Sequence, residues 1–312
     1  MSNILVVGGT GFFGRSILDS FINGTLNDFS INQIILTGRE IPRDILFDKK
    51  KIIFYKYDSA IDKNLPDADY IIYAASSTSS STYTKENYLN EINIQKKSID
   101  NLNNYIFGKK FKKILYTSSG SVYGQKNLIN RNTDEFVKCY PDDNNFEKSI
   151  YSNIKLEWEN YFKDNLIDKS VIARCFAFIG KHTPLSKHFV IGNFLKNYIN
   201  RENIYIKSTS RVYRSFMHAD DLSYWLVFLL INSVNLKNNI FNVGSAEEIE
   251  IHDLANIFNL MLKRSKQNYC LDNKIDRYVP NISRAQKEFN LQLKYNLNQS
   301  ILKVAYELRK HS

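Results

Sequence analysis

Three side chains have the types and the order needed to move a proton. Tyr151 and Lys155 lie four residues apart in the helical pattern SIYSNIKLEWENYF, so both project from one helix face. A lysine ammonium beside a phenol lowers the pKa of the phenol, which makes Tyr151 usable as an acid or base. Ser119 follows an apolar run, and its hydroxyl can hydrogen-bond a substrate oxygen while Tyr151 transfers the proton. In a chain with 20 tyrosines the pair could also be a solvated helix face, and Ser119 a helix cap.

The start of the chain supplies the context that separates these interpretations. The apolar run Ile4–Val7 leads into Gly8, Gly11 and Gly14, after which a helical apolar pattern begins. A strand, a glycine turn and a helix in this order leave backbone N–H groups at a helix N-terminus, which suits a pyrophosphate. A glycine triplet alone is also what an ordinary turn contains. Its place between a strand and a helix favours dinucleotide binding.

The next apolar segment, Gln33–Gly38, bears on which dinucleotide is bound. An acidic residue near the end of this strand holds the ribose 2′-hydroxyl of NAD, whereas a basic residue accommodates the 2′-phosphate of NADP. Here Arg39 follows the segment, and Glu40 comes after it. The arginine favours NADP over NAD, unless Arg39 is only a surface loop residue.

Apolar strand-like segments alternate with helical patterns along much of the chain. The alternation predicts an α/β fold, a Rossmann doubly wound parallel sheet with a smaller C-terminal α/β substrate lobe. We expect residues 1–180 and 214–247 to form the dinucleotide-binding domain, and residues 181–213 and 248–312 to form the lobe. Strands are expected at residues 4–7, 33–38, 51–58, 70–75, 113–118, 171–180, 203–207 and 240–244.

Composition excludes several classes of protein. No segment of the 312 residues approaches the roughly 18 uninterrupted apolar residues of a membrane span. The chain start lacks the pattern of a signal peptide, so we expect a cytoplasmic protein. Three cysteines and five histidines show no disulfide framework and no metal-ligand spacing, so no metal is expected. The net charge of +10 would suit a nucleic acid, but its spread along the chain favours solvated faces.

Six motifs follow one another between residues 4 and 284. They are GGTGFFG at 8–14, SSGSVYG at 118–124, YSNIK at 151–155, ARCFAFIG at 173–180, YRSFMHADD at 213–221 and FNVGS at 241–245. In this order they resemble the extended short-chain dehydrogenases/reductases of the nucleotide-sugar epimerase/dehydratase group. The resemblance implies a nucleotide-diphosphate sugar as substrate, and members of this family commonly form homodimers.

The resemblance also implies roles for individual residues. Ser119, Tyr151 and Lys155 would be catalytic, and Lys155 would bind the cofactor ribose. Asp58 lies where the family holds the adenine, and Asn93 matches an asparagine that supports the site. The other cofactor-binding residues are Gly8, Gly11, Phe12, Phe13, Gly14, Ala74 and Ala75, beside Arg39 and the Tyr151–Lys155 pair. The substrate-binding residues are Ser121, Tyr123, Asn193 and Arg214, the last two at the nucleoside diphosphate.

Departures from the family pattern narrow the expected reaction. The 4,6-dehydratases carry Asp-Glu directly after the catalytic Thr, whereas this chain has Gly120-Ser121, which argues against water elimination. Ala177 replaces a usual asparagine and Lys181 a usual proline. Residues 173–194 look more like a branch found beside surface-polysaccharide genes, which includes sugar-nucleotide 4-ketoreductases.

These features favour an oxidoreductase that uses NADPH to reduce a 4-keto-6-deoxy-sugar nucleotide. The alternative is a nucleotide-sugar 4-epimerase with tightly bound NAD, which would use the same three residues. A hypothesis from another class is a non-catalytic scaffold of this fold that binds RNA or a protein partner. The charge of +10 motivates the scaffold, and the presence of Ser119, Tyr151 and Lys155 argues against it.

Overall fold

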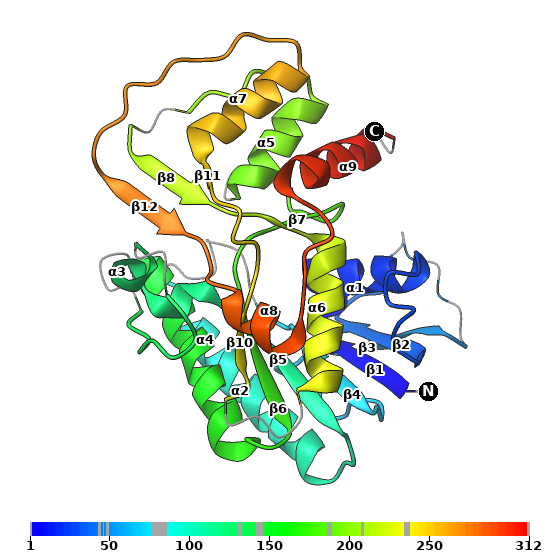
Figure 1. The fold of residues 1–312 in the computed structure, drawn as a ribbon. Coiled ribbons are helices and arrows are strands. Elements are labelled where there is room, and N and C mark those ends of the chain that lie inside the picture. The colour runs from blue at the N-terminus through cyan, green and yellow to red at the C-terminus, as the bar shows by residue number, and fades with distance from the viewer. Residues whose placement is uncertain are drawn as a thin grey trace.

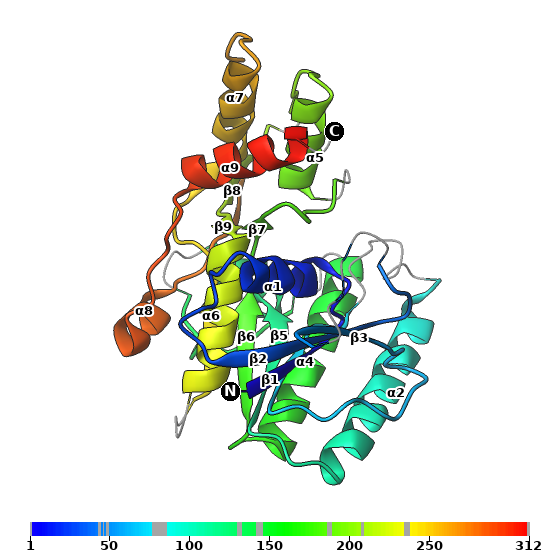
Figure 2. The ribbon, with the colours of Figure 1, turned by 90° about the vertical axis from the view of Figure 1, so that its right-hand side faces the viewer.

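The computed structural model describes residues 2–42, 45, 47, 50–76, 86–129, 133–141, 146–185, 189–206, 209–233 and 238–310. A seven-stranded sheet flanked by helices forms one part, and a smaller lobe of helices and short strands stands at one end of it (Figures 1 and 2). The N-terminus lies in the sheet and the C-terminal helix in the lobe (Figure 1). Within the described ranges, no helix is long and apolar enough to cross a membrane.

The sheet is parallel and has the order β10-β6-β5-β4-β1-β2-β3, which confirms the predicted doubly wound fold. Its strands are β1 (Ser2–Val7), β2 (Ile31–Gly38), β3 (Ile52–Lys56), β4 (Tyr70–Tyr73), β5 (Lys113–Ser119), β6 (Ser170–Cys175) and β10 (Ile240–Val243). Strand order reverses between β1 and β4, so the carboxyl ends of these two strands flank the place where ligands bind in such sheets.

Helices cover both faces of the sheet, and the alternation along β1 shows how the sequence divides the core. Ile4 and Val6 face α1 and α6, whereas Leu5 and Val7 face the side covered by α2 and α4. All four side chains are fully buried, as expected for a parallel sheet covered on both faces. The covering helices are α1 (Phe12–Ile22), α6 (Ala219–Asn232), α2 (Tyr88–Phe107) and α4 (Phe146–Asn165).

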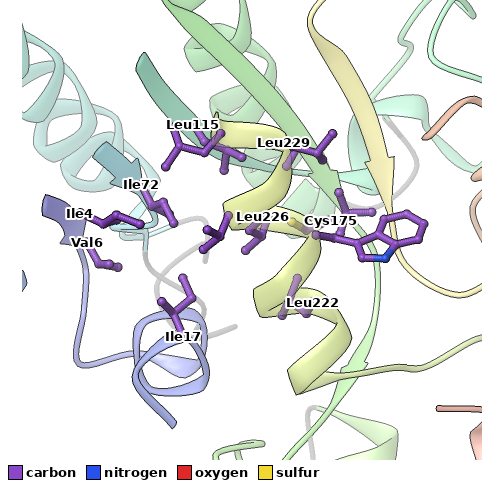
Figure 3. Close-up of a cluster of buried hydrophobic side chains, with 14 of the residues drawn as sticks. Ile4, Val6, Ile17, Ile72, Leu115, Cys175, Leu222, Leu226 and Leu229 are labelled. Atoms are coloured by element: carbon purple, nitrogen blue, oxygen red, sulfur yellow. The ribbon is translucent and has the colours of Figure 1, made fainter. Parts of the chain in front are cut away.

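The apolar core on the face covered by α1 and α6 holds α1 against the sheet. Figure 3 shows Ile17 of α1 beside Val6 and Ile4, with Leu222 and Leu226 of α6 next to them. Burial of each such side chain contributes about 1.5–3 kcal/mol to folding. The helix that begins at the glycine turn is therefore held in place by apolar packing away from the turn itself.

The lobe has its own apolar core, built on a three-stranded sheet of order β11-β8-β12. Its elements are β8 (Arg211–Arg214), β11 (Ile249–Glu250), β12 (Ile275–Tyr278), α5 (Val190–Ile199), α7 (Ile251–Met261) and α9 (Leu297–Lys310). A two-stranded parallel pair, β7 (Phe178–Ile179) with β9 (Met217–His218), joins the lobe to the large sheet. The predicted C-terminal lobe is therefore present.

Three local expectations differ from the structure. The segment 171–180 forms two strands, β6 and β7, because the chain leaves the large sheet after Cys175 to pair with β9. Residues 203–206 are not a strand, because the side-chain amide of Asn259 satisfies both the N–H and the C=O of Ile204. Helix α8 (Ser283–Phe289), expected in the lobe, packs instead on the core of the large sheet (Figure 1).

Candidate active site

A cavity of about 1150 Å³ opens between the carboxyl ends of the sheet strands and the lobe. It is slightly larger than a typical small-molecule site of about 300–1,000 Å³. Its described lining contains six basic side chains and no Asp or Glu. The basic residues are Arg15, Lys148, Lys155, Lys181, His182 and Arg214. This charge distribution favours anionic ligands such as diphosphates.

The glycine turn forms one wall of the cavity. Gly8 has φ +84°, and a Cβ there would lie 2.7 Å from the backbone nitrogen of Ala75. A Cβ on Gly14 would lie 2.3 Å from Cα of Gly9, so the turn and the first helix pack backbone to backbone. Gly11 is the N-cap of α1 and has no side chain to bond the free N–H groups. These groups fit a pyrophosphate, as the sequence predicts.

The predicted cofactor residues next to the turn also lie at the cavity. Phe12, Phe13 and Ala74 line it, together with Gly8 and Gly11. Phe12 and Phe13 form an aromatic group with Phe178, whose ring centroids lie 5.7–6.1 Å from theirs. The structure therefore brings together residues from the first turn, from the end of β4 and from β7.

Helix α4 carries Tyr151 and Lys155 into the cavity, and β5 ends with Ser119 beside them. The Lys155 ammonium donates a hydrogen bond to the Thr117 carbonyl at 2.9 Å. Its Nζ atom lies 5.8 Å from the centroid of the Tyr151 ring. The three residues that the sequence singles out for proton transfer are thus gathered at one place.

The pKa values differ from the simple expectation that Lys155 lowers the pKa of Tyr151. Burial raises the pKa of Tyr151 to about 12, although a hydrogen bond with Ser119 acts in the opposite direction. Burial also lowers the pKa of Lys155 to about 8. Desolvation therefore outweighs the pairing that the sequence indicated, and both groups are held closer to their neutral forms than in water.

Below the site, a buried ionic network supports α4 and β5, and no motif in the sequence indicates it. Glu159, one turn beyond Lys155, accepts two hydrogen bonds from the Arg174 guanidinium at 2.7 and 3.0 Å. It also accepts a hydrogen bond from the Ser118 hydroxyl at 2.6 Å. Both Glu159 and Arg174 are almost completely buried. This network fixes the residue next to Ser119 relative to the helix that carries Tyr151.

The lobe contributes its own residues to the opposite wall. Arg214 lines the cavity, and its guanidinium forms two hydrogen bonds with the Asp276 carboxylate at 3.0 and 3.2 Å. Gln125 of α3 (Gln125–Leu128) donates a further hydrogen bond to this carboxylate. Ser121, in the 3₁₀ turn Gly120–Tyr123, also lines the cavity. Arg214 and Ser121 therefore both line the cavity, and their role in substrate binding stays a prediction.

Tyr278 of β12 and Phe176 were not predicted, but both line the same part of the cavity. Their rings pack on each other with centroids 4.8 Å apart. The Tyr278 hydroxyl lies 3.2 Å from Oγ of Ser119. A lone tyrosine more than 150 residues from Ser119, outside every motif, gives no sequence signal for this contact.

Several predicted residues do not meet at the cavity. Tyr123 is fully buried, and its hydroxyl donates to the Asn242 side chain, so the structure gives it a packing role. Asn93 is exposed on α2, because the buried face of that helix is formed by Glu91, Gln95, Ser98, Asn101, Leu102 and Tyr105. The other predicted residues that do not line the cavity are Gly14, Arg39, Asp58, Ala75 and Asn193, of which Arg39 is exposed.

Curated relatives cover most of the chain at low identity. The chain is 25% identical to UDP-glucuronic acid decarboxylase 1 of Arabidopsis thaliana, over 98% of this chain and 69% of the relative. It is 26% identical to a putative UDP-glucose 4-epimerase of Methanocaldococcus jannaschii, over 81% of this chain and 80% of the relative. These two relatives are named for different reactions.

Solved structures share the fold over nearly the whole chain. UDP-glucose 4-epimerase of Thermotoga maritima, solved with UDP-glucose, superposes with a TM-score of 0.74 at 18% identity and covers 99% of both chains. A dTDP-glucose 4,6-dehydratase of Bacillus anthracis, solved in complex with NAD, gives a TM-score of 0.75 at 18% identity and covers 99% of this chain and 97% of its own.

The model of one protein family matches residues 4–244, which include the glycine turn, Ser119, Tyr151, Lys155 and Arg214. The match extends over more than half of the chain and ends before β12 and the last helices. Membership of an enzyme family confirms the expectation of an enzyme and argues against the alternative hypothesis of a non-catalytic scaffold. The chain belongs to the NAD dependent epimerase/dehydratase family and is an enzyme of that family.

Proposed function

We propose that this enzyme transfers a hydride between a bound nicotinamide dinucleotide and C4 of a nucleotide-activated sugar. One observation carries the proposal. Ser119, Tyr151 and Lys155 lie together in a cavity whose described lining holds six basic side chains and no carboxylate. A hydroxyl, a phenol and an ammonium can handle the proton of a carbinol while the dinucleotide would take the hydride, and the basic lining suits the two diphosphates.

Each of the three residues has a definite task in this chemistry. When bound, the dinucleotide accepts or returns the hydride. Tyr151 takes the proton of the C4 hydroxyl during oxidation and gives it back during reduction. Ser119 hydrogen-bonds the same oxygen, and Lys155 would bind the ribose of the dinucleotide. Gly8, Gly11 and the N-terminus of α1 would hold the cofactor pyrophosphate in the backbone cradle described above.

The contact between Gly120 and Phe176 supports chemistry at C4 without elimination. A Cβ on Gly120 would lie 2.5 Å from the ring of Phe176, so this position cannot hold an acidic side chain while the ring stays in place. Ser121 occupies the next position. Tyr151 is then the proton donor and acceptor for the reaction, and removal of water from neighbouring carbons lacks the carboxylate that it needs.

Of the two net reactions that use these steps, we propose 4-epimerisation as the first candidate. The name of the Methanocaldococcus relative supports it. Arg39, on which the expectation of NADP rests, is exposed and does not line the cavity. Reduction of a 4-keto-6-deoxy-sugar nucleotide by NADPH is the second candidate, favoured by the position of Arg39 directly after β2.

The first experiment identifies any dinucleotide released when the freshly purified enzyme is denatured. Near-stoichiometric NAD supports the epimerase, whereas an empty enzyme that binds NADPH more tightly than NADH supports the reductase. UDP-glucose is then offered as the probe substrate, and formation of its C4 epimer is measured by chromatography. An enzyme that binds neither dinucleotide contradicts both candidates.

The Tyr151→Phe variant tests the proton step. We expect the rate to fall by about 10²–10⁴-fold, because the ring remains while the acid/base group is lost. Dinucleotide binding should be retained, and Tyr105→Phe is the matched control, since its hydroxyl bonds the Pro66 carbonyl outside the cavity. A Tyr151→Phe enzyme with the wild-type rate would exclude this role.

A further inference from the structure

The arginine that the lobe contributes to the cavity is held by a carboxylate on the neighbouring strand. Strands β8 and β12 pair so that Val212 lies opposite Asp276, and Arg214 and Asp276 therefore project from the same face of the lobe sheet. The Asp276 carboxylate accepts hydrogen bonds from Nη1 and Nη2 of Arg214 at 3.2 and 3.0 Å. Arg214 lines the cavity, whereas Asp276 does not. The carboxylate thus binds the arginine from outside the space that a ligand would fill.

The donors that Arg214 uses in these contacts determine which of its donors are left. A guanidinium has five N–H donors, one on Nε and two on each of Nη1 and Nη2. Nη1 also donates to the Tyr213 carbonyl at 2.8 Å and to the Asp276 carbonyl at 3.3 Å, so both of its protons are used. Among the described residues, Nε has no hydrogen-bond partner and Nη2 has only the carboxylate. The Nε–H and the second Nη2–H form one side edge of the guanidinium, which matches two oxygens of a single phosphate.

The Asp276 carboxylate is in turn held from the other side of the cavity. Nε2 of Gln125 donates a hydrogen bond to its Oδ1 atom at 3.2 Å. Gln125 begins α3, which directly follows the 3₁₀ turn Gly120–Tyr123 and its N-cap Ser119. Asp276 therefore links Arg214 of the lobe to the segment that starts at the catalytic serine.

We propose that Asp276 is a positioning residue that fixes the plane of the Arg214 guanidinium and thereby presents its side edge to one phosphate of the substrate diphosphate. This inference rests on the proposed function, which supplies a nucleotide-linked sugar. An arginine that is already held in place loses less conformational entropy when it binds a ligand. The carboxylate also balances the charge of the arginine, so the two-point hydrogen-bond geometry carries the recognition.

Two roles of Asp276 predict opposite effects of Asp276→Asn on the affinity for a diphosphate. If the carboxylate only balances charge, the variant has one more net positive charge at the cavity wall and binds a diphosphate more tightly. If the carboxylate positions Arg214, binding becomes weaker despite the added charge, because the asparagine amide has only one oxygen to accept from the guanidinium. Water can satisfy the freed donor, but it does not fix the plane of the guanidinium.

The test is calorimetric titration of the dinucleotide complex with UDP and with dTDP, and the nucleotide that the wild type binds more tightly is the probe. We expect Asp276→Asn to weaken binding of this probe about five- to tenfold, as for partial loss of a hydrogen bond to a charged group. Unchanged or tighter binding by this variant would overturn the inference. A wild-type enzyme that binds neither nucleotide would overturn it as well.

Asp272→Asn is the matched control for this change. It removes another carboxylate of the lobe, which bonds the Thr209 hydroxyl and the Lys274 N–H outside the cavity. The net charge changes by the same amount as in Asp276→Asn, but no contact of Arg214 is lost. We expect the wild-type affinity for the probe, and an equal loss in both variants would contradict a specific role of Asp276.

A double-mutant cycle shows whether Asp276 acts through Arg214. A lysine ammonium has no planar edge to orient, so in an Arg214→Lys background Asp276→Asn should cause no further weakening of probe binding. If the two losses in log affinity add independently, Asp276 acts by another route and the proposal is wrong.

Steady-state kinetics with UDP-glucose separate this inference from the proposed function. We expect Asp276→Asn to raise KM about five- to tenfold and to keep kcat within about twofold, because the diphosphate is bound equally before and during the reaction at C4. A lower kcat with an unchanged KM contradicts the inference. If the wild type binds the probe but converts no UDP-glucose, the proposed substrate is wrong, while weaker probe binding by Asp276→Asn still supports the role of Asp276.

Discussion

The two walls of the cavity are built in different ways. The wall formed by the large sheet begins with a contiguous turn, in which Gly8 and Gly14 let backbone segments touch each other. The wall formed by the lobe brings together residues far apart in the sequence, and polar side chains join them. Its central contact is the ion pair of Arg214 with Asp276, which are 62 residues apart.

This difference predicts how strongly a mutation in each wall changes the stability of the fold. Polar groups under the sheet are buried, so loss of one partner leaves an uncompensated charge in a dry environment. The Arg214–Asp276 pair is partly exposed, with side-chain exposures of 21% and 35%, so water can replace a lost partner. We therefore expect large effects on folding from the sheet wall and small effects from the lobe wall.

The largest effect on stability is expected for Glu159→Gln. The change keeps the shape of the side chain but leaves the Arg174 guanidinium buried without a counter-charge. Such a loss costs about 3–5 kcal/mol in the free energy of unfolding. Urea denaturation monitored by circular dichroism measures it.

Glu288→Gln is the matched control for this change. Glu288 pairs with Arg284 on α8, and 38% of its side chain is exposed. We expect Glu288→Gln to lower the free energy of unfolding by only about 0.2–1 kcal/mol. Equal costs at the two positions would remove the contrast between buried and exposed pairs.

Gly14→Ala should have a smaller effect on stability and a specific effect on the cofactor. The new Cβ would meet Gly9 backbone atoms at 2.3 Å, and the backbone has no rotamer that moves it away. Overpacking of this kind costs about 1–3 kcal/mol, and the distorted turn should weaken dinucleotide binding more than tenfold. Calorimetric titration measures the affinity.

Gly108→Ala serves as the comparison for Gly14→Ala, because no atom lies within 4 Å of its added Cβ. Its affinity for the dinucleotide should equal that of the wild type. Normal binding by Gly14→Ala would mean that the close turn is not needed for the cofactor.

The smallest effect is expected for Asp276→Asn in the lobe wall. Burial favours the neutral acid, but the hydrogen bond and the charge of Arg214 outweigh it, so the pKa of Asp276 lies below its usual value. The pair therefore stabilises the fold above pH about 3.9, and this contribution is lost as the pH falls through the lowered folded pKa. We expect Asp276→Asn to cost about 0.5–1 kcal/mol at pH 7 and nothing in strong acid.

Unfolding by urea at pH 7 and at a pH below 3 checks this prediction, with dinucleotide affinity as the second readout. The affinity should stay unchanged, because Asp276 belongs to the lobe. A loss of dinucleotide binding in Asp276→Asn would show that the two walls are not independent.

The part of the site that could be predicted lies in contiguous motifs. The spacing of Tyr151 and Lys155 places both on one face of α4, and the glycine turn precedes α1, as expected from local periodicity. The structure does not place Asn93 and Tyr123 at the cavity, for a related reason. A motif match gives a position in the chain, but rotation of α2 exposes Asn93 and a 3₁₀ turn buries Tyr123.

The sequence by itself determined the doubly wound sheet, the cofactor turn and the order of Ser119, Tyr151 and Lys155. These features depend on short-range patterns, since a strand, a turn or a helix face is specified within a few residues. Only the tertiary structure decided that Tyr278 reaches Ser119, that Asp276 holds Arg214, and that burial sets the pKa values of Tyr151 and Lys155. Such contacts and desolvation depend on segments that meet only after the chain has folded, so no local pattern records them.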